Sequence, residues 1–334
     1  MNGAKSPADN TAVQQSGPSP YAPPNTFLFS HLPAWAIPYA ELMRLHKPAG
    51  YWTFYFPHLY GTLFGAIMAG PEKVPISRLI YVNIVFLLGN VLLRGAACSW
   101  NDAVDAPLDR QVARCRNRPC ARGAVSVQQA YVFTFVQCAI GLVVLTALPP
   151  LCMVYWVPLT LMCCGYAFAK RLTDYPQVVL GFSLAVGQWV GAAAVGYDVA
   201  KVQHHHLPAV ICFYLANVIC AVVVDAVYSH QDLKDDLKAG VKSIAVAWQE
   251  KTKPLLWILT TFQIALVAAA GYLLELGTGY HLLATAGTAL ISWSMVYKVD
   301  LGRPESCWWW FVNSIYGTGA CLSGGIFSSY LLQL

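Results

Sequence analysis

Acidic residues gather at one point of the 334-residue sequence with the spacing of a metal site. Asp102, Asp105 and Asp109 fall at positions i, i+3 and i+7, and Asn101 adds an amide oxygen beside them. Residues at these spacings share one face of a helix, so the carboxylates would point in one direction. Such oxygens suit hard divalent ions, and Mg²⁺ in particular combines a few protein carboxylates with the phosphate oxygens of a substrate.

A second acidic stretch repeats this spacing later in the chain. Asp225, Tyr228 and Asp232 again fall at i, i+3 and i+7, and Asp235 and Asp236 follow them. An acidic residue at a helix end is most often only solvated, but nearly half of the 16 acidic residues of the chain belong to these two stretches. We therefore expect the two stretches to face each other and to bind divalent ions.

Basic residues accompany both acidic stretches. Positively charged side chains neutralise a polyanion directly and complement the metal ions that hold it. Metal-binding acids with basic residues around them therefore predict a substrate that carries a diphosphate group. The basic residues in question are Arg114, Arg116, Arg118, Lys170, Arg171, Lys234 and Lys238.

The elements that must position these residues are membrane-spanning helices. Hydrophobic residues make up 57% of the chain and charged residues 11%, whereas about 25% charged residues are typical of a soluble protein. Apolar segments recur at roughly the 20 residues that a helix needs to cross a bilayer. We predict an all-α, multi-pass transmembrane helical bundle with about nine spans. The expected spans are 50–70, 79–100, 128–148, 150–169, 177–197, 207–227, 254–275, 280–297 and 308–332.

The distribution of basic residues predicts the topology of this bundle. With nine spans, one side of the membrane carries 17 of the 21 Lys and Arg residues, and the other side carries 3. Positive charge concentrates in cytoplasmic loops. The first side, which includes the N-terminus and both acidic stretches, is therefore expected to be cytoplasmic.

Residues 1–38 are predicted to form a disordered tail ahead of a transmembrane domain at 39–334, because a Pro-rich polar segment without an apolar run buries too little surface to fold. The tail lacks the Arg-rich composition of a mitochondrial import signal. We therefore expect the protein in an intracellular membrane, the endoplasmic reticulum or the Golgi rather than the mitochondrion.

The motifs together resemble the UbiA superfamily of intramembrane prenyltransferases. The family pattern has Asn-Asp-x-x-Asp-x-x-x-Asp after the second span, here Asn101–Asp109, and an acidic motif after the sixth span, here Asp225–Asp236. It also has Tyr-x-x-x-Lys after the fourth span, here Tyr166–Lys170, and the likeness runs from about Tyr39 to the C-terminus. Relatives often carry Thr where this chain has Cys115, so a hydroxyl contact near the phosphates is expected to be missing.

The resemblance implies transfer of a prenyl group from a prenyl diphosphate to an aromatic small molecule. The chain looks most like the members of fungal meroterpenoid pathways, which attach chains such as farnesyl to polyketide-derived phenols. A 4-hydroxybenzoate polyprenyltransferase of ubiquinone biosynthesis is the alternative within the family. A secondary transporter is the alternative outside it, since acidic residues within membranes also mark ion pathways. Neither nucleic acid nor an obligate protein partner is implied.

The roles of the acidic residues follow as a hypothesis. Each acidic stretch would hold one Mg²⁺, and both ions would hold the same diphosphate, which lowers the barrier to breaking the allylic C–O bond. The expected ligands are Asn101 and Asp105, assisted by Asp102 or Asp109, for one ion, and Asp232 and Asp236, assisted by Asp225, for the other.

The remaining site residues are expected to act on the substrates. Asp105 and Asp232, with Lys170 and Tyr166, are the expected catalytic residues. Arg94 lies inside the second span and is expected either to pair with Asp102 or Asp225, or to contact the diphosphate or an acidic group of the aromatic acceptor. Arg44 has the same two roles open to it. The expected substrate-binding residues are Arg114, Arg118, Lys170, Arg171, Tyr228, Arg44 and Arg94.

Overall fold

The computed structural model describes residues 21–334, and within this range it contains helices and no strand. The all-α prediction is confirmed. A π-helical segment, His281–Ala286, joins α13 to α14. The α-helices are α1 (Phe27–His31), α2 (Ile37–Leu42), α3 (Ala49–Ala69), α4 (Ile76–Asp109), α5 (Val127–Leu145), α6 (Leu151–Leu172), α7 (Pro176–Ala185), α8 (Gly187–Ala194), α9 (Leu207–Ser229), α10 (Leu233–Ala239), α11 (Ile244–Trp248), α12 (Thr252–Leu273), α13 (Gly277–Tyr280), α14 (Gly287–Lys298) and α15 (Pro304–Leu332).

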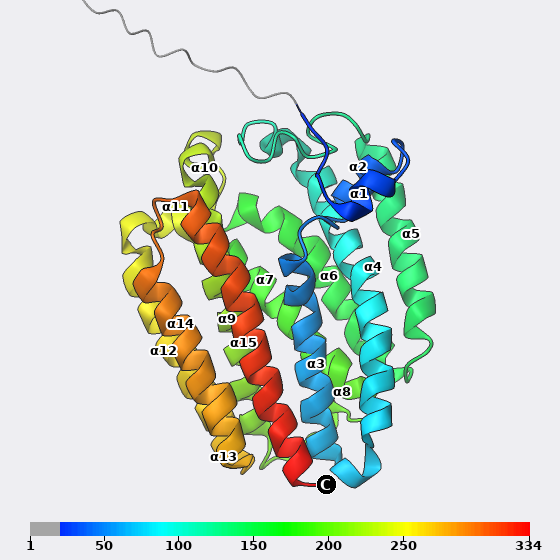
Figure 1. Cartoon of the computed structure of the whole chain (residues 1–334), viewed down its shortest axis with the longest axis vertical. Helices are drawn as coiled ribbons and strands as arrows, with labels where there is room; N and C mark the ends of the chain where they lie inside the picture. Colours follow the sequence, from blue (N-terminus) through cyan, green and yellow to red (C-terminus); the bar gives the residue numbers. More distant parts are fainter. Residues whose placement is uncertain (1–20) are drawn as a thin grey trace, which may run out of the picture.

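The long helices form a bundle that also contains the shorter α7 and α8, and other short helices lie at its ends (Figure 1). Helices α1, α2 and α10 lie at one end of the bundle, and α13 and the C-terminus lie at the other. Large apolar side chains such as Leu88, Phe135 and Leu161 are exposed on its outside, which is the arrangement of a bundle surrounded by lipid. The chain is a multi-pass membrane protein.

Six helical segments of the described residues are long and apolar enough to cross a membrane. Helices also occupy the three other predicted spans, as α3, α13 with α14, and α15, but they are not among the six. The count of about nine spans therefore remains a prediction. The six segments are 76–109, 127–145, 151–172, 176–194, 207–239 and 244–273.

Helices α3 and α8 pack backbone against backbone. A Cβ atom at Gly61 would lie 1.9 Å from the carbonyl oxygen of Gln188, and one at Gly191 would lie 2.2 Å from the carbonyl oxygen of His58. Only glycine allows this approach, and small residues serve the same purpose in other membrane helix pairs. The contact fixes α3, which forms one wall of the site described below.

The predicted tail differs from the structure in its second half. Residues 1–20 lie outside the described residues, but 21–38 contain α1 and the start of α2. Phe29 is buried, and the hydroxyl of Tyr21 donates a hydrogen bond of 2.8 Å to Glu41, which also forms an ion pair with Arg122. Composition gave no sign of these partners, because they belong to the end of the bundle that this segment covers.

Candidate active site

The two acidic stretches meet at one end of the bundle. The first stretch ends α4, and the second runs from the end of α9 through a 3₁₀ turn, His230–Asp232, into α10. Asp105 and Asp232 line one polar cavity of about 90 Å³. Other residues that line this polar cavity are Asp109, Arg114, Arg118, Tyr166, Lys170, Gln177, Asp225, Tyr228 and Asp236.

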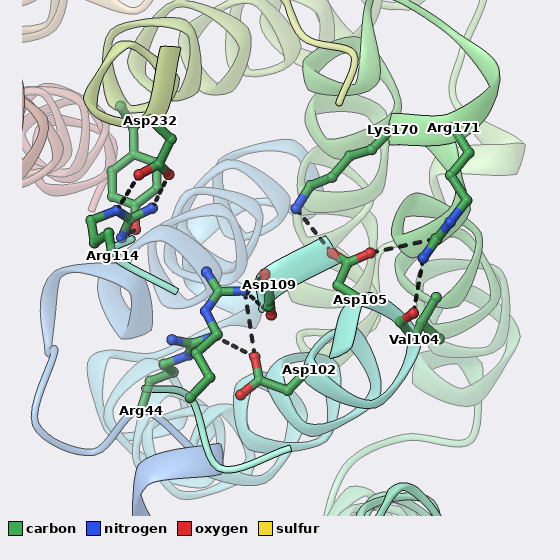
Figure 2. Close-up of polar contacts among 11 residues, drawn as sticks. Arg44, Asp102, Val104, Asp105, Asp109, Arg114, Lys170, Arg171 and Asp232 are labelled. Carbon is green, nitrogen blue, oxygen red and sulfur yellow. Dashed lines mark hydrogen bonds and ion pairs between the residues drawn. The ribbon is translucent and has the colours of Figure 1, made fainter. Parts of the chain in front are cut away.

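Every carboxylate of the first stretch is buried and paired with a basic side chain (Figure 2). Asp102 accepts a hydrogen bond from Arg44, which comes from the turn between α2 and α3. Asp109 accepts hydrogen bonds of 2.9 and 2.7 Å from the guanidinium of Arg118. A buried charge is tolerated when it is paired and hydrogen-bonded, so these pairs explain how the acids persist there.

Asp105 lies between two cations of α6. The ammonium of Lys170 donates a hydrogen bond of 3.0 Å to one oxygen of Asp105, and Nη1 of Arg171 lies 3.4 Å from the other oxygen. Arg171 also donates to the carbonyl of Val104 at 2.9 Å, which ties the ends of α4 and α6 together. The Tyr-x-x-x-Lys element is thereby placed directly against the first acidic stretch.

The loop after α4 links the first stretch to the second. Arg114 donates two hydrogen bonds to the carboxylate of Asp232, one from Nε at 2.8 Å and one from Nη2, and a third of 2.7 Å to the hydroxyl of Tyr228. The amide of Ala113 donates to Asp235 at 2.9 Å. A bidentate pair of this kind fixes both partners in one orientation.

The acids do not form a closed metal cage. Across residues 21–334 there is no group of three or more His, Cys, Asp or Glu side chains placed as metal ligands. Three buried oxygens of the first stretch nevertheless accept no hydrogen bond: Asn101 Oδ1, Asp102 Oδ2 and Asp105 Oδ1. Mg²⁺ needs only one or two carboxylates when substrate phosphates supply further ligands. The residues therefore fit a metal ion that binds together with a phosphorylated substrate.

The prediction that Arg94 pairs with Asp102 or Asp225 is wrong. Its guanidinium donates to three backbone carbonyls of the turn between α2 and α3, those of Met43, Arg44 and Lys47, at 2.9 to 3.0 Å. Backbone carbonyls of a turn inside the protein need hydrogen-bond donors, and Arg94 supplies them. Asp102 does not pair with Arg94 because it already forms an ion pair with Arg44.

Several predicted residues lie near the site in different ways. Tyr166 lines the polar cavity, and its hydroxyl forms no hydrogen bond with residues 21–334. Asn101, Asp102, Arg44 and Arg171 lie beside the cavity but do not line it. Three of the basic residues singled out by sequence also do not line it: Arg116, Lys234 and Lys238.

The sequence reasoning missed Lys47, which lies beside the basic residues of the site but does not line the polar cavity. Burial, and after it the charges of Arg44, Arg114 and Arg118, lowers the pKa of Lys47 from its usual 10.5 to about 8. No carboxylate lies within 4 Å of its ammonium among residues 21–334. A half-buried lysine among arginines indicates that this side of the site attracts an anion. Its position three residues after Arg44 was the signal available in the sequence.

A second, apolar cavity of about 200 Å³ lies inside the bundle next to the polar cavity. Aromatic side chains of α3 and α15 form much of its wall, and Arg94 and Asn217 are among its few polar residues. Among residues 21–334, Asp225 is the one residue that lines both cavities. The aromatic wall consists of Phe54, Phe56, Tyr60 and Phe311.

Comparison with known proteins identifies the family. Residues 58–316 match the family described as the UbiA prenyltransferase family, which covers both acidic stretches and the Tyr-x-x-x-Lys element. The chain belongs to the UbiA prenyltransferase family. It is an enzyme of the prenyltransferase class, so the resemblance predicted from the motifs is confirmed and the transporter alternative is set aside.

Curated relatives of this UbiA family member include enzymes of both predicted kinds. A mitochondrial 4-hydroxybenzoate polyprenyltransferase of Saccharomyces cerevisiae is 37% identical over 91% of this chain and 79% of its own length. The prenyltransferase stbC of Stachybotrys bisbyi is 34% identical over 91% of each chain. A DMOA farnesyltransferase of Aspergillus novofumigatus is 35% identical over 78% of this chain and 80% of its own length.

Solved structures of UbiA homologues share the fold of this chain. An apo UbiA homologue from Aeropyrum pernix has a TM-score of 0.64 at 24% identity and covers 81% of this chain and 96% of that one. A UbiA homologue from Archaeoglobus fulgidus, solved with GPP and Mg²⁺, has a TM-score of 0.65 at 18% identity and covers 88% and 99%. The UbiA-like helical bundle predicted from sequence is therefore confirmed.

Proposed function

We propose that this enzyme transfers a prenyl group, farnesyl by preference, from its diphosphate to a phenolic acid of polyketide origin, with Mg²⁺ as cofactor. One observation supports this above the others. A polar cavity lined by both acidic stretches adjoins an apolar cavity, and the two meet at Asp225. A prenyl diphosphate has the same two halves, one highly charged and one purely apolar.

The diphosphate would bind in the polar cavity. Lys170 and Arg114 already point basic groups at the carboxylates that line it, and Arg118 adds a third cation. Metal ions would be held by Asn101 and Asp105 on one side and by Asp232 and Asp236 on the other. Bound Mg²⁺ would supply positive charge that stabilises the departing diphosphate, an effect worth several kcal/mol in other enzymes. The UbiA homologue of similar fold that was solved with GPP and Mg²⁺ supports a prenyl diphosphate and Mg²⁺ as what this site binds.

The prenyl chain would enter the apolar cavity. Its aromatic wall excludes water, and ring faces stabilise nearby positive charge through cation–π attraction. Lys170 and Arg114 would keep the released diphosphate in the polar cavity by ion pairs, so that it stays away from the allylic carbon. The electron-rich ring of the acceptor, held in van der Waals contact, then attacks that carbon and loses its proton.

Arg94 favours an acceptor that carries an acidic group. Three of its five N–H donors are taken by backbone carbonyls, which leaves Nε and one hydrogen of Nη2 as a fork. The free Nε and Nη2 donors of Arg94 face Gly50. Because glycine has no side chain, these donors stay accessible, whereas a Cβ at position 50 would lie 2.8 Å from Nη2. Arg94 and Gly50 both line the apolar cavity, and no carboxylate of residues 21–334 pairs with Arg94. A carboxylate matches such a fork in a bidentate manner.

An acidic group on the acceptor suits both kinds of curated relative. The yeast relative is named for 4-hydroxybenzoate, which is a phenolic acid, and a 4-hydroxybenzoate polyprenyltransferase is therefore the second candidate. The farnesyltransferase of Aspergillus novofumigatus and the other fungal prenyltransferases support the first candidate. The 17-to-3 distribution of basic residues supports a cytoplasmic active site. The membrane that we propose for the protein is that of the endoplasmic reticulum or Golgi.

The test is a reconstituted reaction. Purified protein in lipid nanodiscs is given Mg²⁺, farnesyl diphosphate or a longer polyprenyl diphosphate, and a panel of phenolic acids with their decarboxylated counterparts. We expect release of diphosphate together with a prenylated product, only from acceptors with the acidic group, and complete loss of both with EDTA. A preference for 4-hydroxybenzoate with long chains would select the second candidate, and product from decarboxylated phenols would refute the role of Arg94.

A further inference from the structure

Asp225 has a position that no other acid of the two stretches shares. It lies on α9 one turn before Tyr228, and Asp232 follows in the 3₁₀ turn after that helix. Whereas Asp105, Asp109 and Asp232 line the polar cavity only, Asp225 lines the polar and the apolar cavity at once. Its carboxylate therefore lies at the boundary between them.

Asp225 forms no ion pair within 4 Å, and across residues 21–334 the same holds for Asp235 and Asp236 at the far end of the second stretch. Asp102, Asp105, Asp109 and Asp232 each form an ion pair within 4 Å. The basic groups that would hold a diphosphate thus pair with these four acids, whereas Asp225 has the amide of Gln177 and, farther away, the charges of Lys170 and Arg114 on its polar side. A carboxylate at the edge of an apolar cavity needs hydrogen-bond donors on that side too, and within residues 21–334 no cation lies within 4 Å of it there.

The chemistry of the proposed function places the reaction at the same boundary. The bond that breaks joins the diphosphate, in the polar cavity, to the first carbon of the prenyl chain, in the apolar cavity. The aromatic acceptor must approach that carbon from the apolar side, because basic residues and metal ligands occupy the polar side. Asp225 is therefore next to the acceptor ring. This step rests on the proposed function.

We propose that Asp225 binds the aromatic acceptor, with its carboxylate accepting a hydrogen bond from the phenolic hydroxyl, and that it is not a metal ligand. Arg94 lines the same apolar cavity and would hold the acidic group of the acceptor. The acceptor is then oriented by its two polar ends. A ring carbon beside the hydroxyl faces the boundary between the cavities, so the enzyme prenylates carbon next to the hydroxyl and leaves the hydroxyl oxygen unmodified.

The acceptor role and a metal-ligand role predict different kinetics. For Asp225→Asn we expect the KM of the phenolic acid to rise about 10- to 100-fold, the range for losing a hydrogen bond to a charged group. The KM of the prenyl diphosphate and the Mg²⁺ concentration for half-maximal rate should change less than about twofold. A change of this size is expected of a substitution that removes no contact with either ligand. Asp232→Asn is the matched variant, because Asp232 lines the polar cavity only. It should instead raise the Mg²⁺ concentration for half-maximal rate.

A second readout uses the acceptor with its phenolic hydroxyl replaced by a methoxy group. As a competitive inhibitor it should bind the wild-type enzyme about 10-fold or more weakly than the phenol, and Asp225→Asn should remove most of that difference. Asn keeps the shape of Asp, and binding of a non-reactive prenyl diphosphate analogue reports that the variant is folded. An Mg²⁺ requirement raised as much as in Asp232→Asn, or an unchanged acceptor KM, would overturn the proposal. Failure of the wild-type enzyme to prenylate any phenolic acid would instead refute the proposed function.

Discussion

We expect Lys47 to make binding of the prenyl diphosphate depend on pH in the alkaline range. Its pKa of about 8 in the free protein results from burial and from the neighbouring Arg44, Arg114 and Arg118. A diphosphate bound among these cations would stabilise the protonated lysine and return its pKa towards the usual 10.5. Protonated Lys47 therefore favours binding, and affinity is lost as pH rises through about 8.

The magnitude follows from the two pKa values. With a pKa of about 8 free and 10.5 bound, the KM of the prenyl diphosphate should be nearly constant between pH 6.5 and 7.5 and about tenfold higher at pH 9 than at pH 7. The pH dependence that Lys47 gives to the folding stability has the opposite sign. The unfolded chain binds more protons at Lys47 between these values, so this residue makes the free protein more stable as pH rises.

The assay measures initial rates of diphosphate release against prenyl diphosphate concentration at each pH, with acceptor and Mg²⁺ saturating. Lys47→Arg is the matched control, because its guanidinium stays charged throughout this range. We expect a KM that rises above pH 8 for wild type and stays level for Lys47→Arg. A parallel rise in both proteins would assign the effect to another group, and a level wild-type profile would refute the reasoning about Lys47.

Two further substitutions test the geometry of the site. Arg114→Lys keeps the charge but loses the bidentate contact with Asp232. The kcat/KM for the prenyl diphosphate should therefore fall about 10-fold or more in the same release assay. An unchanged kcat/KM would show that the contact between the loop and Asp232 is dispensable. Gly50→Ala places a Cβ 2.8 Å from Arg94 Nη2, so the acceptor KM should rise about 10-fold. Gly141→Ala is the control for Gly50→Ala, because a Cβ added at Gly141 has no neighbour within 4 Å. If both variants changed the acceptor KM equally, the role of the free Arg94 donors would be refuted.

Spacing along helices predicted the acidic and basic residues of the site well. Asp105 and Asp109 line one cavity because positions four residues apart share a helix face, and Lys170 reaches Asp105 from α6. Spacing did not reveal that Asp102 lies beside this cavity, or that Asp225 lines the apolar cavity as well as the polar one. Which cavity a side chain reaches depends on the neighbouring helices, and these have no signature in the local sequence.

The partners of Arg94 were beyond prediction for a related reason. A charged residue within a span indicates a partner, but backbone carbonyls of a distant turn look the same in every sequence. The turn itself depends on Arg44 adopting a positive φ of 56°, a conformation that a non-glycine residue seldom takes. The helical segments were placed correctly, whereas the number that cross the membrane stays open because α3, α13 with α14, and α15 are not among the six segments found long and apolar enough.

The convergence of the two acidic stretches on one diphosphate is tested most directly by turnover of Asp105→Ala and Asp232→Ala. Each variant is assayed for diphosphate release and prenylated product in nanodiscs, beside wild type with and without EDTA. A shared site predicts that each substitution alone lowers the rate by about 10²-fold or more, because either stretch without its carboxylate leaves the leaving group insufficiently stabilised. Near-normal turnover by either variant, with the EDTA effect intact in wild type, would contradict it.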